Sequence, residues 1–320
     1  MLDCGTYYPK RSEGMCTAVW DKINGLFGRT LDLEYTYDEQ VVVSRGERWG
    51  GPYTMVGIAT VAEGYPLYYD GVNEKGLAMA GLHFPRSCVY PPPREGAENV
   101  GSYALIPTLL ARCATVAEAV AEMGRLHLCD TPFSEVYPPT PLHWMLADRE
   151  KAVVIEATAD GMQVMDNPAG VMTNEPPLPH QLTHLSHYAH LTPLQPAGRW
   201  QSPVSRGGGC VGMPGDYTSP SRFVRAAFGA AHTTAENREE RVGGYFRRMA
   251  AVEVPRGWVQ AEDGRWVVSH YTSCMDLEGG VYHYRTYGCH RITAVRLRIP
   301  DGEDMMCYPL RRQEDMRWEN

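Results

Sequence analysis

The feature that most constrains the fold is a turn dipeptide inside the first hydrophobic stretch of the chain. Strand-forming residues at Cys16–Lys22 and Leu26–Leu33 flank Asn24-Gly25, the pair that type I′ hairpin turns prefer. A two-residue turn at this dipeptide would pair Trp20 with Arg29 and Thr17 with Asp32. The sequence therefore predicts an antiparallel hairpin with Asp32 beside Cys16, and with Arg29 on the same face as Cys16.

The rest of the chain follows a mostly β pattern with a few helices. Turn signals at Asp70-Gly71, Asp160-Gly161 and Gly279-Gly280 separate several of the strand-like runs. Thr115 and Glu118 match a capping box that opens a helix. No repeat or linker divides the chain, so we expect an α+β fold in which residues 16–320 form one domain, with two layers of antiparallel strand and helices outside. The expected strands are 40–44, 55–62, 144–147, 152–157, 162–165, 266–271, 281–287 and 292–299, and the expected helices are 103–113, 116–126, 219–231 and 235–251.

Composition and charge exclude several classes of protein. The 320 residues carry a net charge of -8, which gives no electrostatic footprint for nucleic acid. No apolar stretch approaches the roughly 20 residues that span a bilayer. The first fourteen residues contain no apolar segment typical of a secretory signal. We therefore expect a cytoplasmic protein with neither nucleic acid nor membrane as a partner.

Neither a metal nor a nucleotide cofactor is predicted. The nine cysteines are irregularly spaced and form no C-x-x-C pair, so most are expected to be small buried residues in a reducing compartment. His180, His184, His187 and His190 have the spacing of ligands on a helix, but two prolines bracket them and no carboxylate lies among them. The glycine pattern at 207–212 matches a dinucleotide fingerprint without the strand before it or the helix after it.

Met15-Cys16 offers a specific catalytic chemistry at the head of the hairpin. If Met15 and the residues before it are removed, Cys16 carries both a thiol and a free α-amine, with ordinary pKa values of about 8.5 and about 8. The amine can then accept the thiol proton and later protonate a leaving amine. Arg29 could lower the thiol pKa and Asp32 could orient the amine; the alternative is an ordinary ion pair at a strand edge.

Motifs along the whole chain resemble one family, the choloylglycine hydrolases, which include bile salt hydrolases and penicillin V acylases. The resemblance implies an N-terminal nucleophile hydrolase with an αββα four-layer sandwich, two antiparallel sheets and no cofactor. It implies that Cys16 is the nucleophile, that Arg29 and Asp32 position it, that Asn174 belongs to the oxyanion hole, and that Arg222 is the remaining catalytic arginine. The motifs are Met15-Cys16-Thr17, 27–32, 73–77, 80–85, 141–144, 172–176, 214–217 and 221–223.

The resemblance leaves the substrate open at one position. His83 stands where bile salt hydrolases usually have asparagine and penicillin V acylases usually have tyrosine. The segments 141–148, 159–161 and 166–168 resemble bile salt hydrolases of Gram-positive gut bacteria, and the loop at Ser205-Arg206-Gly207 resembles those that favour taurine conjugates. A steroid acyl group needs a broad apolar pocket. Besides His83, the residues expected to contact substrate are Trp20, Phe84, Phe133 and Tyr137, for which core packing is the alternative role.

The expected activity is hydrolysis of the amide that joins a bile acid to glycine or taurine, through a thioester on Cys16. One alternative is penicillin V acylase or another N-acyl amidase of the same family. The other is a binding paralogue whose N-terminus stays blocked. Residues 1–15 are expected to be either a propeptide removed by self-cleavage or the result of a start assigned upstream of Met15. By analogy with the family, a homotetramer is expected.

Overall fold

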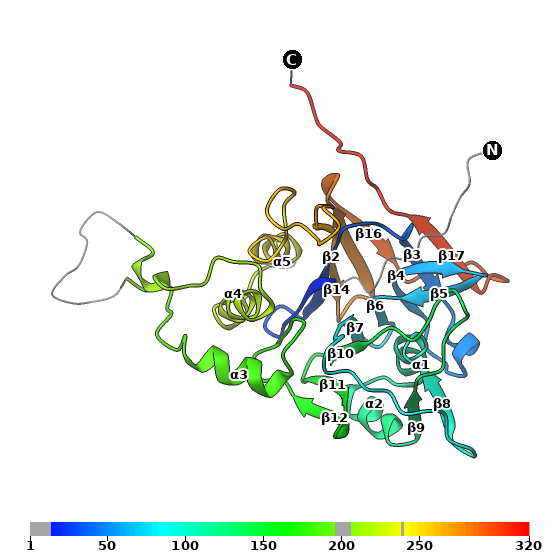
Figure 1. Ribbon diagram of the computed structural model, residues 1–320. Coiled ribbons are helices and arrows are strands. Elements are labelled where there is room, and N and C mark those ends of the chain that lie inside the picture. Colours follow the sequence, from blue (N-terminus) through cyan, green and yellow to red (C-terminus); the bar gives the residue numbers. More distant parts are fainter. Residues whose placement is uncertain (1–13, 196–205, 238–239, 320) are drawn as a thin grey trace.

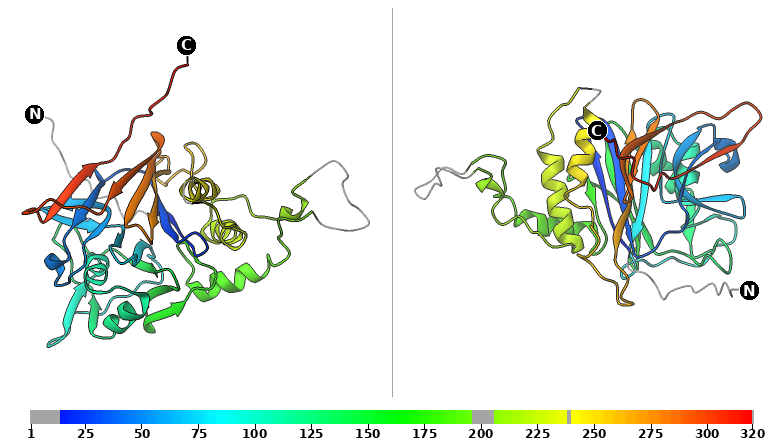
Figure 2. Two further views of the ribbon diagram at one scale, coloured as in Figure 1. Left: turned by 180° about the vertical axis from the view of Figure 1, so that it is seen from behind. Right: turned by 90° about the horizontal axis from the view of Figure 1, so that it is seen from above.

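The computed structural model describes residues 14–195, 206–237 and 240–319. Two antiparallel sheets pack face to face between two layers of helix (Figures 1 and 2). Helices α4 and α5 cover the outer face of the first sheet through contacts with β1, β2 and β14, and α1 covers the outer face of the second through β4, β6 and β7. This confirms the expected αββα arrangement.

The first sheet holds the predicted hairpin at its centre. Its strand order is β13-β1-β2-β14-β15-β16, with every neighbouring pair antiparallel. The strands are β1 (Met15–Asp21), β2 (Leu26–Leu33), β13 (Val171–Met172), β14 (Val268–Asp276), β15 (Val281–Thr286) and β16 (Cys289–Arg296).

The second sheet has the order β12-β11-β10-β7-β6-β4-β3-β17, and β5 pairs with β4. A separate parallel pair is formed by β8 and β9. The strands are β3 (Gln40–Ser44), β4 (Met55–Ala62), β5 (Tyr65–Tyr68), β6 (Asp70–Asn73), β7 (Ala78–His83), β8 (Glu98–Gly101), β9 (Leu126–Cys129), β10 (Leu142–Ala147), β11 (Ala152–Thr158), β12 (Gly161–Asp166) and β17 (Met305–Pro309).

The helices are short, and their boundaries have local causes. The Thr115 hydroxyl accepts a hydrogen bond from the Glu118 amide at 3.2 Å, while the Glu118 carboxylate accepts one from the Ala114 amide at 2.7 Å, so the expected capping box opens α2. The helices are η1 (Gly46–Trp49), α1 (Leu105–Arg112), α2 (Val116–Met123), α3 (Leu178–Ser186), η2 (Gly208–Cys210), α4 (Ser219–Ala231) and α5 (Arg241–Met249). Helix α5 is shorter than the expected 235–251.

The register of the first hairpin differs from the prediction by two residues. Asp21 pairs with Leu26, so the loop holds four residues, and Thr17 faces Thr30 rather than Asp32. The carboxylate of Asp21 accepts hydrogen bonds from both the backbone and the side-chain amide of Asn24, at 3.0 and 2.9 Å. Asn24 is buried by these contacts and by the Glu236 amide, which donates to its side chain at 2.9 Å. Tertiary contacts of Asn24 therefore override its preference for a two-residue turn.

Asp70-Gly71 was expected to be a turn and instead lies within β6. Gly71 sits against β4, where a side chain on Gly57 would come within 2.0 Å of the Asp70 carbonyl oxygen. Asp70 itself is fully buried and faces the other sheet. Gly57 and Gly71 allow the backbones of β4 and β6 to approach closely, and the buried Asp70 carboxylate is stabilised by partners distant in sequence. The Asp70-Gly71 dipeptide is therefore part of a strand rather than a turn.

Candidate active site

The five predicted catalytic residues meet at the beginning of β1, although they come from four separate segments. Cys16 lies on β1, Arg29 and Asp32 lie on β2, Asn174 follows β13, and Arg222 lies on α4. All five are buried: Cys16 is 2% exposed and Asn174 is 9% exposed. The site thus lies where the N-terminal strand, flanked by the second sheet and by α4, enters the sandwich (Figure 1).

Arg29 approaches Cys16 from the space between the two sheets. Cys16 pairs with Leu31, and alternation along β2 places Arg29 on the same face, as predicted. Its Nη2 donates to Cys16 Sγ at 2.6 Å, and its Nη1 donates to the carbonyl of Gly81 on β7 at 2.8 Å. The Nε donates to the Thr30 carbonyl at 3.0 Å. The guanidinium is therefore fixed by backbone carbonyls and presents one N–H pair to the sulfur.

Arg222 and Asp32 act from the opposite face of the same sheet. Nη1 of Arg222 donates to the Cys16 carbonyl at 2.5 Å and to the Thr17 hydroxyl at 2.8 Å. Asp32 pairs with Met15 and accepts hydrogen bonds from the hydroxyls of Thr30 at 2.9 Å and Ser269 at 2.5 Å. Cys16 is thus contacted by an arginine on each face, at its sulfur by Arg29 and at its carbonyl by Arg222.

Asn174 contacts the backbone nitrogen of the nucleophile. Its Oδ1 accepts from Cys16 N at 2.9 Å and from Arg222 Nη2 at 2.8 Å. A guanidinium can only donate, so this pairing fixes which side-chain atom of Asn174 is the oxygen. Its Nδ2 donates one hydrogen to the His83 carbonyl at 2.9 Å, which leaves the second for another acceptor. The arrangement suits an amide donor held beside a reacting carbonyl.

Burial and charge act in opposite directions on the ionisation of the site. Burial raises the pKa of the Cys16 thiol above its ordinary value, while Arg29 and Arg222 act to lower it. Burial also raises the pKa of Asp32 to about 6, against the opposing charge of Arg222. Burial alone would lower the pKa of Arg29, but the charges around it outweigh burial and raise that pKa, so Arg29 stays protonated.

His83 contacts the residue that lies two positions before the nucleophile. Its Nδ1 accepts a hydrogen bond from the Gly14 amide at 3.0 Å, and a side chain at residue 14 would come within 2.4 Å of that nitrogen. Burial, with Arg29 and His143 nearby, lowers the pKa of His83 to about 4, so the imidazole is neutral near pH 7. Gly14 and Met15 therefore lie against the nucleophile in the unprocessed chain.

A cavity of about 820 Å³ opens in front of Cys16. Its lining includes Arg29 and His83 together with seven tyrosines, and it includes Phe133 and Tyr137 as predicted. Phe133 packs against the rings of Tyr65, Tyr103 and Tyr137 with centroids 5.1–6.0 Å apart. This volume lies within the range of about 300–1,000 Å³ that small-molecule sites occupy.

Two residues expected at the cavity wall lie elsewhere, which corrects that expectation. Trp20 is on the part of the hairpin distant from Cys16, and its indole N–H donates to the Asp148 carbonyl at 2.9 Å. Phe84 is fully buried and stacks on His143 with the ring centroids 4.2 Å apart. Neither lines the cavity. Phe84 is the first residue after β7, which ends at His83.

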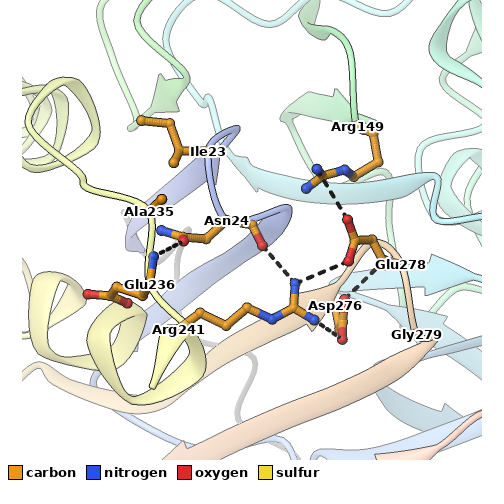
Figure 3. Close-up of a pocket in the computed structure, with 9 residues that line it drawn as sticks. All are labelled: Ile23, Asn24, Arg149, Ala235, Glu236, Arg241, Asp276, Glu278 and Gly279. Carbon is orange, nitrogen blue, oxygen red and sulfur yellow. Dashed lines mark hydrogen bonds and ion pairs between the residues drawn. The ribbon is translucent and has the colours of Figure 1, made fainter. Parts of the chain in front are cut away.

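A second cavity, of about 470 Å³, lies at the turn of the hairpin (Figure 3). Five charged side chains line it. Four are paired with one another, Arg241 with Asp276 at 2.5 Å and Arg149 with Glu278 at 3.2 Å, while Glu236 pairs with Arg248 outside the lining. Arg241 also donates to the Asn24 carbonyl at 2.8 Å. These ion pairs hold the turn in place, and the cavity contains no nucleophile.

The histidine run and the glycine pattern lie in and beside short helical segments. His180 and His184 lie on α3, and no group of three or more metal-ligating side chains gathers anywhere in residues 14–195, 206–237 and 240–319. The glycine pattern forms a short turn of 3-10 helix, η2, rather than a strand followed by a long helix. No helix within the described ranges is long and apolar enough to cross a membrane. Cys4 and most of the segment 1–15 lie outside the described residues.

Sequence reasoning missed several groups that hold the catalytic side chains. The Gly81 carbonyl positions Arg29, and the Ser269 hydroxyl positions Asp32. A backbone carbonyl leaves no trace in the sequence, and Ser269 is distant from Asp32 along the chain. Thr30 could have been found, because residues two apart on a strand share a face.

Comparison with known proteins agrees with the fold. Residues 16–307 match the model of the linear amide C–N hydrolases, choloylglycine hydrolase family. A protein from Lactiplantibacillus plantarum named bile salt hydrolase/transferase is 37% identical, covering 93% of this chain and 98% of its own. The corresponding protein from Clostridium perfringens is 32% identical over 88% of this chain and 92% of its own.

Solved structures of two enzymes share the fold of this chain. A cysteine-to-alanine variant of conjugated bile acid hydrolase from Clostridium perfringens superposes with a TM-score of 0.85 and 30% identity, covering 96% of this chain and all of that chain. Penicillin V acylase from Agrobacterium tumefaciens shares the fold with a TM-score of 0.69 at 21% identity, over 88% of this chain and 86% of its own. The chain belongs to the choloylglycine hydrolase family of enzymes that cleave linear amide C–N bonds.

Proposed function

We propose that this enzyme hydrolyses conjugated bile acids, cleaving the amide between the steroid acyl group and glycine or taurine. The observation that carries the proposal is the placement of Cys16 Sγ, held by Arg29 at 2.6 Å, in the wall of the 820 Å³ cavity. The cavity combines aromatic rings with phenolic hydroxyls, which suits a rigid apolar acyl group that carries its own hydroxyls. Relatives named as bile salt hydrolases at 32–37% identity support the same substrate class.

Catalysis requires Cys16 to become the first residue. In the unprocessed chain the Cys16 nitrogen is an amide, and an amide has no usable lone pair. Once residues 1–15 are removed, the same nitrogen is an α-amine whose position is set by the Asn174 Oδ1 contact of 2.9 Å. We propose that residues 1–15 are lost, by self-cleavage or through a start at Met15, and that this frees the space beside His83 as well.

The proposed cycle uses one residue as nucleophile and base. The α-amine takes the thiol proton, and the thiolate attacks the amide carbonyl carbon. The second Nδ2 hydrogen of Asn174 stabilises the oxyanion, an interaction typically worth about 3–4 kcal/mol of the barrier. The C–N bond then breaks as the ammonium protonates the departing amine. Water activated by the α-amine finally hydrolyses the thioester and releases the bile acid.

The roles of the two arginines follow from their contacts. Arg29 carries a fixed positive charge against the sulfur and favours the thiolate over the buried thiol. Arg222 binds the Cys16 carbonyl and the Asn174 oxygen together, so it keeps the nucleophile and the oxyanion donor in one geometry. We assign Asp32, which pairs with Met15 and accepts from the Ser269 hydroxyl, the role of orienting the new ammonium.

Two other functions are alternatives to bile acid hydrolysis. The first is a penicillin V acylase or another N-acyl amidase, which shares the same catalytic residues and differs only in the acyl group. The second is a binding paralogue in which residues 1–15 stay attached and Gly14 and Met15 occupy the site.

The deciding experiment compares free taurine and glycine released from conjugated bile acids, with penicillin V alongside. It uses the chain expressed from Met15, with the mature terminus determined by mass spectrometry. Amino acid release by a chain that begins at Cys16 supports the proposal, and we expect Cys16→Ser to lose about 10³-fold or more of it while keeping its melting temperature. Cleavage of penicillin V alone transfers the assignment to the acylases. The binding paralogue is tested by mass spectrometry of the protein from its native host: a mature chain that begins at Met1 favours it, and one that begins at Cys16 excludes its premise.

We also propose where the enzyme is located and how it assembles. We place the enzyme in a reducing compartment, the cytoplasm, because eight cysteines within the described ranges are free thiols. The homotetramer expected from the family stays a prediction, which light scattering of the purified protein tests directly.

A further inference from the structure

Asp70 is a buried carboxylate in β6 that the proposed chemistry does not use. It is fully buried and belongs to the second sheet, yet most of its hydrogen-bond donors come from the first. Its Oδ1 accepts from the Tyr282 hydroxyl at 2.6 Å, and its Oδ2 accepts from the hydroxyls of Ser273 at 3.0 Å and Tyr271 at 3.1 Å. The Ile58 amide adds a fourth contact, to Oδ1 at 3.3 Å. Burial raises the pKa of Asp70 above its ordinary value, while the charge of Arg29 and these hydrogen bonds act to lower it.

The same donors connect Asp70 to Arg29. The Arg29 backbone amide donates to the Ser273 hydroxyl at 3.1 Å, and that hydroxyl donates in turn to Asp70. The Arg29 guanidinium lies 5.9 Å from the ring centroid of Tyr271, whose hydroxyl donates to the same Asp70 oxygen, Oδ2, as the Ser273 hydroxyl does. Arg29 is therefore bounded by Asp70 and its hydroxyl partners on one side and by Cys16 Sγ on the other.

Asp70 adds a second buried carboxylate to the charged groups around the nucleophile. Arg29 and Arg222 are buried cations, and Asp32 and Asp70 are buried anions. Within the described ranges Asp70 forms no direct ion pair, so its charge acts on Arg29 through Tyr271 and Ser273 and through space. The titratable groups that face Asp70 from the surrounding elements are Arg29 on β2, Tyr271 on β14 and Tyr282 on β15, with Tyr245 on α5 more distant.

We propose that Asp70 is a positioning residue for the reaction: together with Tyr271, Ser273 and Tyr282 it fixes Arg29 and sets the charge balance that determines when the Cys16 thiol ionises. The proposal rests on Cys16 being the nucleophile, as in the proposed function, but not on which acyl group the enzyme accepts. Without the Asp70 charge, the positive groups near Cys16 have one counter-charge fewer. The thiolate is then favoured, and the thiol ionises at lower pH.

The test is Asp70→Asn in the mature protein, which keeps the volume of the side chain and removes its charge. The primary readout is the pH dependence of alkylation of Cys16 by iodoacetamide, followed on the Cys16 peptide by mass spectrometry. This needs no substrate, so it gives a result even if bile salts are not cleaved. We expect the inflection to move to lower pH by on the order of half a unit, as for a buried charge acting across an intervening group. Where an amide substrate is found, the acidic limb of kcat/KM should move the same way, with kcat lower by about tenfold and KM little changed.

Glu156→Gln is the matched control. Glu156 is equally buried in the second sheet, where it contacts His143 at 3.3 Å, but it is not among the groups that act on Arg29. We expect this variant to lose stability and to keep the wild-type alkylation inflection.

If Asp70→Asn does not fold, the double variant Tyr271→Phe with Tyr282→Phe replaces it. It retains both rings and removes two donors, so Asp70 takes up a proton and the inflection again moves to lower pH. An unchanged inflection in whichever of these variants folds, with only a lower melting temperature as in Glu156→Gln, overturns the proposal and makes the network purely structural.

Discussion

Replacing Asn174 separates the two functions that its side chain combines. Asn174→Asp keeps an oxygen for Cys16 N and Arg222, at the positions that now accept at 2.9 and 2.8 Å, and removes the N–H donors. Asn174→Ala removes both the acceptor and the donors. Loss of one oxyanion donor costs about 2.7–4 kcal/mol, which corresponds to roughly 10²–10³-fold in kcat. We therefore expect kcat of both variants to fall by at least about 10²-fold. Only the aspartate variant keeps an oxygen that accepts from Cys16 N and Arg222.

The assay is kcat and KM for a taurine or glycine conjugate, measured together with the melting temperature. Asn174→Ala also leaves the Arg222 Nη2 group and the Cys16 nitrogen without an acceptor, at about 1–3 kcal/mol for each unsatisfied donor. Its melting temperature should fall by several degrees. Asn174→Asp should stay closer to the wild type in stability, because Arg222 pairs with the new carboxylate, while its kcat falls as far as that of the alanine variant.

The reasoning fails if Asn174→Asp turns over within about threefold of the wild type. In that case the donor of Asn174 does not stabilise the oxyanion, and the residue acts only by holding Arg222 and the N-terminus. A large rise in KM with unchanged kcat in either variant would contradict it equally, because the oxyanion forms only in the transition state.

Two further predictions concern ionisation and the cavity. In the full-length Cys16→Ala chain, which cannot cleave itself, Asp32 has a pKa of about 6 against an ordinary 3.8, so the folded state holds a proton that the unfolded state releases. Asp32 should therefore contribute a fall in stability of about 3 kcal/mol as the pH rises from about 4 to about 6, and Asp32→Asn should lose that part of the slope in thermal unfolding. A smaller slope from Asp70, whose pKa is also raised by burial, should remain, and a slope unchanged from that of the Cys16→Ala chain contradicts the assignment. For the cavity, Phe133→Ala should raise KM for bile acid conjugates about tenfold with kcat within about threefold, whereas Trp20→Ala should lower the melting temperature and leave KM unchanged. Equal effects of the two variants on KM would show that the cavity does not bind the acyl group.

Local sequence patterns predicted the parts of the molecule that depend on neighbours in the chain. The alternation of β2 placed Arg29 on the face of Cys16, and the capping box placed the start of α2. The strands 40–44 and 55–62 have the bounds that their composition indicates. These features follow from side-chain direction and backbone hydrogen bonding over a few residues, which one sequence contains in full.

The register of the hairpin and the strand at Asp70 could not be predicted in this way. Asn24 forms hydrogen bonds to the segment at 233–236, and Asp70 accepts hydrogen bonds from β14 and β15. In both cases a polar residue with a strong local preference for a turn is buried by partners more than 200 residues away. Contacts at that separation override local propensity, because an unsatisfied buried polar group costs more than an unfavourable turn.

The sequence by itself determined which chemistry is available: a cysteine after a methionine, a cation on its strand face, and family motifs that name Asn174 and Arg222. Only the tertiary structure decided how these groups meet. It placed Arg29 and Arg222 on opposite faces of one strand, gave Asn174 its orientation, and replaced Trp20 and Phe84 at the cavity by a group of tyrosines. The physical reason is that ionisation, orientation and access depend on burial and on distances between atoms, and these are set by the packing of two sheets whose strands are far apart in the chain.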